Sequence, residues 1–290
     1  MTEPASHFYR SQGLKLHYVD WGNESAPPLL LIHGERDHCR SWDFVAQQLR
    51  DEYHVLAIDL RGHGDSQWSH GAFYTEVAFI HDVAQFIHVR RAAPLNILGH
   101  SLGGSIGLLY SGTFPETVRK IVAIEGLGPA PDKVLQREAV PIEERLRESI
   151  HVRRQASTLA NRTYGKIDAA VARMLEVNGR LSEEQARHLS IHGTYQNEDG
   201  TLSWKFDPAL RVRSRVGDLS YEQQYRLWDR ISCPVLLVRG TESWASDPVL
   251  DGRAGRFRDV RSVNIGGAGH WVHHDQLEPL LPELRGFFRE

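Results

Sequence analysis

Short apolar runs alternate with amphipathic stretches along the first third of the chain. Apolar runs bounded by turn residues are typical of buried strands, and strict alternation is typical of a half-exposed strand. On this basis we predict strands over residues 14–21, 28–32, 54–59, 94–98 and 120–124. Apolar residues recur at helical spacing between them, which predicts helices over 41–50, 75–89 and 102–111. Such alternation of strand and helix predicts a mostly parallel sheet.

The alternation stops after residue 126 and returns at residue 231. The C-terminal part predicts strands over 234–238 and 260–265 and helices over 248–257 and 275–288. The residues between are more polar, and Ile142, Leu146 and Ile150 recur at four-residue spacing, which predicts helices there. We therefore predict a core made of residues 1–126 and 231–290, with a helical cap of residues 127–230 inserted after the sixth core strand.

The composition is that of an ordinary globular protein: 290 residues, 41% of them hydrophobic and 24% charged. The net charge of −3 provides no basic field, which argues against general nucleic-acid binding. Cys39 and Cys233 lie far apart and do not suggest a disulfide framework. The N-terminus has no apolar run, and no stretch reaches the ~18 apolar residues of a membrane span. We expect a cytoplasmic protein with neither a nucleic-acid nor a membrane partner.

The segment Gly99-His100-Ser101-Leu102-Gly103 carries the strongest chemical signal. A G-x-S-x-G motif that follows a predicted strand and opens a predicted helix has the context of a nucleophile elbow. Small residues two before and two after the serine let strand and helix approach closely, and the helix N-terminus favours negative charge. We predict Ser101 as the nucleophile. The alternative is a serine that only caps the helix.

The loop after the strand over 28–32 is a candidate for half of an oxyanion hole. Acyl transfer needs two backbone N–H groups aimed at the oxyanion. We assign these to Leu102, which follows the nucleophile, and to Glu35 in the His33-Gly34-Glu35 loop. A carboxylate beside the oxyanion would oppose the developing charge. We therefore expect the Glu35 side chain to turn away and pair with Arg36, His38 or Arg40.

A histidine is needed as the base, because its pKa lies near neutrality. His270 follows a glycine turn between the last predicted strand and the last predicted helix. The order serine then histidine, with the histidine near the C-terminus, is that of the α/β-hydrolases. We predict His270 as the base and expect His273 and His274 to face solvent or the cap.

Four motifs occur in the order shown by the α/β-hydrolase superfamily, which the chain resembles over essentially its whole length. They are His33-Gly34, the DLRGHGDS segment 59–66, the elbow 99–103 and Gly269-His270. The resemblance implies an α/β-hydrolase fold, with a mostly parallel twisted sheet flanked by helices and a helical cap insertion. It also implies that segment 59–66 braces the edge of the active site. The WKFDP segment 204–208 is similar to one in lidded esterases and carbon–carbon hydrolases.

The third member of the predicted triad departs from the common pattern, in which an acid follows the strand 234–238 at the end of V-x-G-x-x-D. Here Ser243 occupies that place, so the candidates are Glu242, Asp247 and Glu125. Glu125 ends the strand 120–124, where some dehalogenases, luciferases and lactonases of this superfamily carry their acid. Burying a carboxylate there without a partner would be costly. We favour Glu125, with a salt bridge to a cap arginine as its alternative role.

These residues predict a serine esterase that cleaves small to medium carboxylic esters through an acyl-serine, without a cofactor or metal ion. Gly34, His100 and Trp271 are the predicted pocket residues. A serine at 101 disfavours epoxide hydrolases and haloalkane dehalogenases, which resemble this chain but use aspartate there. A lactonase, a carbon–carbon hydrolase of ring-fission diketones and a non-turnover receptor stay open as alternatives. The expected partner is a small ester, and the oligomeric state is open.

Overall fold

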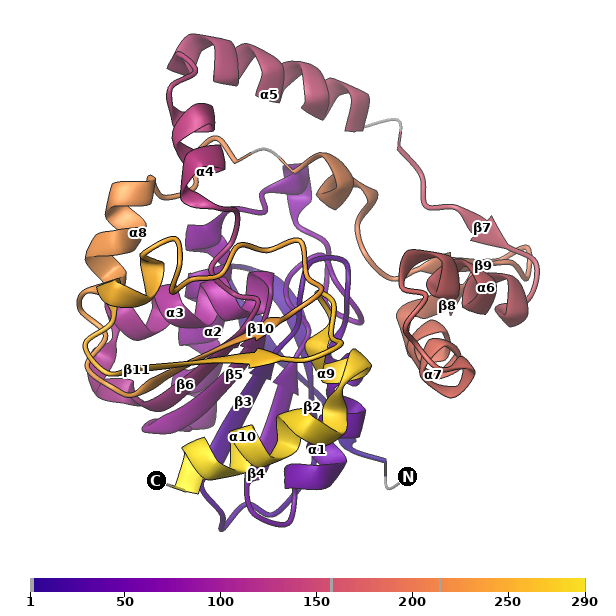
Figure 1. The fold of residues 1–290 in the computed structure, drawn as a ribbon. Coiled ribbons are helices and arrows are strands. Elements are labelled where there is room, and N and C mark those ends of the chain that lie inside the picture. Colours follow the sequence, from indigo (N-terminus) through magenta and orange to yellow (C-terminus); the bar gives the residue numbers. More distant parts are fainter. Residues whose placement is uncertain (1–2, 157–158, 214, 290) are drawn as a thin grey trace.

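An eight-stranded sheet forms the centre of the molecule (Figure 1). The computed structural model describes residues 3–156, 159–213 and 215–289. The strands lie in the order β1-β2-β4-β3-β5-β6-β10-β11. Their bounds are β1 Ala5–Ser11, β2 Leu14–Asp20, β3 Pro28–Ile32, β4 His54–Ile58, β5 Leu95–His100, β6 Val118–Ile124, β10 Val235–Gly240 and β11 Val260–Ile265. The strands β1 and β2 pair antiparallel, and all pairs from β4 to β11 are parallel. The predicted mostly parallel sheet is confirmed.

The strand β1 was not predicted from the sequence. Five of its seven residues are exposed, so it contains no apolar run that the pattern could reveal. It is held in place by its antiparallel pairing with β2 and by burial of Tyr9 in the core beside Phe86.

Helices cover both faces of the sheet, and each face has its own hydrophobic core. Side chains alternate along a strand, so Leu30 points to one core and Leu31 to the other. The first core contains Phe86 of α2 and Trp228 of α8, and the second contains Leu284 of α10. The helices concerned are α1 Asp43–Leu49, α2 Glu76–Arg90, α3 Leu102–Thr113, α8 Tyr221–Trp228 and α10 Leu277–Arg289, with the short α9 Val272–Asp275 before α10.

The segment between β6 and β10 is mainly helical, as predicted, but also holds a small second sheet. Its strands pair antiparallel in the order β7-β9-β8. In Figure 1, α5 extends over one end of the molecule, and α6, α7 and the small sheet lie together to one side. The elements are α4 Pro131–Glu138, α5 Ile142–Ala156, β7 Thr163–Tyr164, α6 Ile167–Val177, α7 Glu183–Gly193, β8 Thr194–Gln196, β9 Leu202–Trp204, the 3-10 helix η4 Pro208–Val212 and α8. The division into a core and a cap at residues 126/127 and 230/231 stays a prediction.

The helix predicted over 248–257 is wrong. The structure has turns there and one 3-10 helix, η5, over Arg253–Arg256. Gly252 adopts a left-handed conformation with φ of 82°, which interrupts any helix. The guanidinium of Arg253 is buried and donates to the carbonyls of Leu127 and Gly128. The segment is therefore ordered by a tertiary contact that apolar periodicity does not reveal.

None of the helices in the described ranges is long and apolar enough to cross a membrane.

Candidate active site

Ser101 lies on the sharp turn between β5 and α3. Its φ of 50° and ψ of −117° are unusual for a non-glycine residue, and its N–H donates to the carbonyl of Ile124 at 2.8 Å. A Cβ on Gly103 would come within 2.2 Å of the carbonyl oxygen of Ile32, and one on Gly99 within 2.5 Å of that of Gly103. The two glycines of the motif are thus required by the close approach of β5, α3 and β3, as the elbow predicts.

His270 is brought to Ser101 from the other end of the chain. Its Nε2 lies 3.0 Å from the Oγ of Ser101, within hydrogen-bonding distance. The Nε2 of His100 donates to the carbonyl of His270 at 2.9 Å, which ties the histidine loop to the elbow. The ring of Trp244 lies against the His270 imidazole, with centroids 4.9 Å apart. The predicted nucleophile and base are therefore neighbours in space.

Glu125 completes this cluster from the end of β6. Its side chain is fully buried, and its Oε2 lies 3.5 Å from the Nδ1 of His270. Its other oxygen accepts from the N–H of Gly240, and Oε2 also accepts from the hydroxyl of Ser243, each at 2.8 Å. The residue has a positive φ of 53°, so the chain turns sharply here. Ser243, in the common place of the acid, thus donates to the carboxylate of Glu125.

The two alternative acids lie in other contacts. Glu242 is exposed and pairs with Arg180. Asp247 accepts from the N–H of Val249 at 2.8 Å and from the amide of Asn264 at 3.1 Å. Among the described residues, the carboxylate that comes within 4.0 Å of a His270 ring nitrogen is that of Glu125.

The loop of Gly34 and Glu35 passes directly beside the elbow. A Cβ on Gly34 would lie 2.9 Å from the Nδ1 of His100 and 3.3 Å from the Cβ of Ser101. Leu102 is the first residue of α3, where backbone N–H groups have no partner within the helix. The two backbone segments predicted to form the oxyanion hole therefore flank the nucleophile.

The prediction that the Glu35 side chain pairs with Arg36, His38 or Arg40 is wrong. Arg40 pairs with Glu3 and Asp43, and His38 lies 3.1 Å from the carbonyl of Leu189. Among the described residues Arg36 forms no ion pair with Glu35 either. Glu35 instead interacts electrostatically with Arg215, a residue far away in sequence. Only the tertiary fold of residues 127–230 brings that arginine here, so local sequence could not reveal it.

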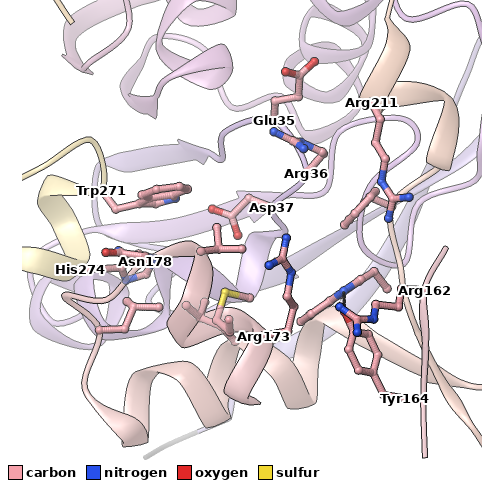
Figure 2. Close-up of a pocket in the computed structure, with 16 residues that line it drawn as sticks. Glu35, Arg36, Asp37, Arg162, Tyr164, Arg173, Asn178, Arg211, Trp271 and His274 are labelled. Carbon is pink, nitrogen blue, oxygen red and sulfur yellow. Dashed lines mark hydrogen bonds between the residues drawn. The ribbon is translucent and has the colours of Figure 1, made fainter. Parts of the chain in front are cut away.

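Two adjoining cavities open around this cluster. The smaller, of about 290 Å³, is lined by all the predicted site residues, Ser101, His270, Glu125, Glu35, Leu102, Gly34, His100 and Trp271. The larger, of about 480 Å³, is lined mostly by residues between 162 and 211, a stretch that includes α6, α7 and the small sheet (Figure 2). Glu35, Arg36 and Trp271 line both cavities. Sequence reasoning identified the serine, histidine and glutamate that lie together here but missed the arginines and apolar side chains of the larger cavity, because no local motif marks them.

The two other histidines after His270 are buried. His273 stacks on the ring of Trp42 with centroids 4.5 Å apart, so the expectation that it faces solvent or the cap is wrong. His274 lines the larger cavity, and its carbonyl accepts from Gln185 of α7, in agreement with an orientation toward the cap. Burial lowers the pKa of His273 well below its usual value and that of His274 to about 3, so both rings are neutral.

The segment 59–66 lies outside both cavity linings and braces the loop before α1. Asp59 accepts from the N–H of Cys39 at 2.6 Å and from that of Asp65 at 2.9 Å, and it contacts His17 at 2.7 Å. Despite its burial, these donors hold the pKa of Asp59 well below its usual range. Arg61 forms a buried two-point ion pair with Asp82 of α2.

Three groups in the described part of the chain bring possible metal ligands within 4.8 Å of one another. They are His17, Cys39 and Asp59; Asp37, His100 and His273; and Asp43, His188 and His192. In the first and third groups a histidine and an aspartate already pair at 2.7 and 3.1 Å. Cys39 is buried, and burial raises the pKa of its thiol. The expectation of a metal-free and cofactor-free site stays a prediction.

Comparison with known proteins identifies the family. The model described as the alpha/beta hydrolase family matches residues 29–282. The chain belongs to the alpha/beta hydrolase family. This alpha/beta hydrolase is similar to an esterase of Mycobacterium tuberculosis, with 26% identity over 98% of this chain and 89% of the relative. It is also similar to a serine hydrolase-like protein of Dictyostelium discoideum, with 25% identity over 96% of this chain and 79% of the relative.

Solved structures share its fold. A thioesterase domain from the curacin biosynthetic pathway has a TM-score of 0.87 at 24% identity, over 98% of this chain and 100% of that domain. These comparisons confirm the predicted α/β-hydrolase fold, and the named relatives support a hydrolase activity. They leave the substrate of this alpha/beta hydrolase open.

Proposed function

We propose that the protein is a serine esterase that cleaves small to medium carboxylic esters through an acyl-serine, without a cofactor. One observation carries the proposal: the Nε2 of His270 lies 3.0 Å from the Oγ of Ser101, while a buried carboxylate faces the other ring nitrogen. A nucleophile, a base and a group that orients the base, in this geometry, are the requirements of acyl transfer.

In the proposed reaction, Ser101 Oγ attacks the ester carbonyl while its proton moves to Nε2 of His270. Glu125 holds the imidazole with its Nδ1–H directed at Oε2 and stabilises the imidazolium that forms. The N–H groups of Leu102 and Glu35 stabilise the oxyanion. His270 then gives its proton to the leaving alcohol, and the acyl group remains on Ser101. Water, activated by His270, releases the acid and restores the serine.

The cavities support a substrate of small to medium size. The ester lies in the smaller cavity against Gly34, His100 and Trp271, and an apolar substituent extends into the larger one. Because Trp271 lines both cavities, it lies at their junction and limits what passes. The segment 127–230 contributes most of the larger cavity and acts as a cap that sets substrate length.

The test is hydrolysis of p-nitrophenyl acetate, butyrate, octanoate and palmitate by the wild type and by Ser101→Ala. We expect turnover of the shorter chains and a loss of kcat on the order of 10⁴- to 10⁶-fold in the variant. Ser105→Ala is the matched control, since Ser105 lines the same cavity one turn further along α3. Retention of more than a tenth of the activity by Ser101→Ala would overturn the mechanism. Little turnover of any ester by the wild type would favour a lactone, a ring-fission diketone or a receptor role.

A further inference from the structure

The larger cavity combines an apolar floor with a positively charged rim. Its apolar side chains are Met174, Val177, Leu181, Leu189, Trp204 and Phe206. Four arginines, Arg36, Arg162, Arg173 and Arg211, line the same cavity. Figure 2 shows Arg162, Arg173 and Arg211 gathered on one side of it, while the carboxylate of Glu35 points away from them. The cavity thus concentrates positive charge in a chain whose net charge is −3.

Two of these arginines, Arg162 and Arg211, contact neutral groups, which do not offset their charge. Arg211 donates to the carbonyl of Ala160 and to the side-chain oxygen of Asn161, at 3.3 and 3.1 Å. Its guanidinium also lies 5.4 Å from the ring centre of Phe206, and that of Arg162 lies 5.9 Å from that of Tyr164. Such contacts position a guanidinium while leaving donors for an anion.

Acidic groups around the cavity do little to change this balance. In the described part of the chain Arg173 pairs only with Glu176, and both members of that pair are exposed, so it contributes little. The acids that line the cavity are Glu35 and Asp37. Burial raises the pKa of Asp37 to about 7, so this carboxyl is partly protonated near neutrality.

The smaller cavity also has arginines, but acids equal them in number. Arg36, Arg137 and Arg215 line it together with Glu35, Glu76 and Glu125. Arg215 interacts favourably with the carboxyl groups of Glu35 and Glu76. The uncompensated positive charge thus lies in the larger cavity, beyond Trp271 as seen from Ser101.

We propose that the substrate carries a carboxylate or phosphate, which binds to Arg162, Arg173 and Arg211 while an apolar segment spans the distance to Ser101. This inference rests on the esterase function proposed above and adds the charge of the substrate. Guanidinium groups bind carboxylate and phosphate oxygens through paired N–H donors, so either anion fits. Because apolar side chains make up much of the remaining lining, the anion is expected to be separated from the scissile bond by a hydrocarbon chain.

The two sources of the anion are separated by two matched pairs of substrates. For a carboxylate on the acyl group, p-nitrophenyl hydrogen adipate is compared with p-nitrophenyl hexanoate. For a phosphate on the leaving group, the hexanoyl thioester of phosphopantetheine is compared with that of pantetheine, which lacks only the phosphate. Each exposed ion pair changes affinity by about 1.4- to 5-fold, so three arginines predict about a tenfold preference in kcat/KM for the charged member of one pair. The preference should fall as salt rises.

The variants Arg162→Gln and Arg211→Gln, singly and together, are expected to reduce this preference at least threefold through KM, while kcat for p-nitrophenyl hexanoate changes little. Arg226→Gln is the matched control, because Arg226 pairs with Glu222 on the exposed surface of α8, outside both cavities.

Equal kcat/KM within both pairs would overturn the inference, and so would a preference that survives the double variant. A preference abolished by Arg137→Gln or Arg215→Gln instead would overturn the assigned position of the anion. Hydrolysis of the neutral hexanoate that depends on Ser101 would still support the esterase function, so the two proposals can fail separately.

Discussion

Glu125→Gln tests the most unusual assignment in the site. The substitution keeps the shape and size of the side chain but removes the negative charge that faces the Nδ1 of His270. The amide oxygen that the substitution introduces can still accept from the N–H of Gly240, and the amide NH2 group can donate to the hydroxyl oxygen of Ser243, so the fold should be retained. Any loss of activity would therefore report on the charge and on the orientation of His270.

The expected size of the effect follows from the geometry. Two unit charges 3.5 Å apart, the distance between Glu125 Oε2 and His270 Nδ1, interact by roughly 5 kcal/mol at an effective dielectric constant of ~20. At about 1.36 kcal/mol per tenfold change in rate, this corresponds to a loss of kcat of about 10³- to 10⁴-fold. The carboxylate is fully buried, so solvent provides little screening at this distance.

The assay is kcat for p-nitrophenyl butyrate, measured beside Glu242→Gln and Asp247→Asn, which we expect to stay within about threefold of the wild type. Circular dichroism and thermal unfolding check that each variant is folded. If Glu125→Gln keeps more than a tenth of the activity, or if either control loses as much, the assignment of the acid is wrong. As a further arm, Ser243→Asp in the Glu125→Gln background should recover about tenfold in kcat, because the Ser243 hydroxyl lies 2.8 Å from the oxygen that faces His270.

Two further predictions concern stability. Gly103→Ala should lower the free energy of unfolding by more than about 2 kcal/mol, because the new Cβ would lie 2.2 Å from the backbone oxygen of Ile32. Gly286→Ala in α10 should instead raise the free energy of unfolding by about 0.5–1 kcal/mol, because its new Cβ would meet no neighbouring atom within 4 Å. Urea unfolding measures both, and equal stabilities for the two variants would contradict the packing argument. Acidification from pH 6 to pH 5 should also destabilise the protein. Five buried histidines whose pKa burial holds far below its usual value take up protons only on unfolding, while two buried acids with a pKa of about 7 lose theirs. Unfolding therefore binds more than one net proton, and stability falls by more than about 1.4 kcal/mol; unchanged or higher stability at pH 5 would refute this. The groups are His38, His63, His100, His273, His274, Asp37 and Glu76.

Much of the fold was predictable because its signals are local. Each buried parallel strand is a short apolar run. The elbow 99–103 requires glycines, because any side chain at Gly99 or Gly103 would clash with neighbouring backbone. The strand β1 and the segment 248–257 were missed or misassigned because pairing with β2 and the buried guanidinium of Arg253 order them. Neither interaction leaves a periodic pattern in the sequence.

Periodicity also predicted a helix without predicting what it packs against. Ile142, Leu146 and Ile150 lie on α5, as expected, but each is 44–51% exposed. The spacing of apolar residues is sufficient to indicate a helix, whereas its burial depends on tertiary placement. The same limitation applies to the larger cavity, whose arginines come from separate elements of residues 127–230 and from the loop after β3.

The position proposed for the acid explains why the sequence left three candidates for it. The strands β6 and β10 are far apart along the chain but are parallel neighbours in the sheet. Their carboxyl ends therefore meet at the same edge, and the N–H of Glu125 donates to the carbonyl of Val238. A carboxylate at the end of either strand can reach His270, so the site constrains the position of a charge in space rather than a place in the sequence. The Ser243 hydroxyl donates to the Glu125 carboxylate. An acid at position 243 and a hydroxyl at position 125 would therefore form the same hydrogen-bonded pair beside the histidine.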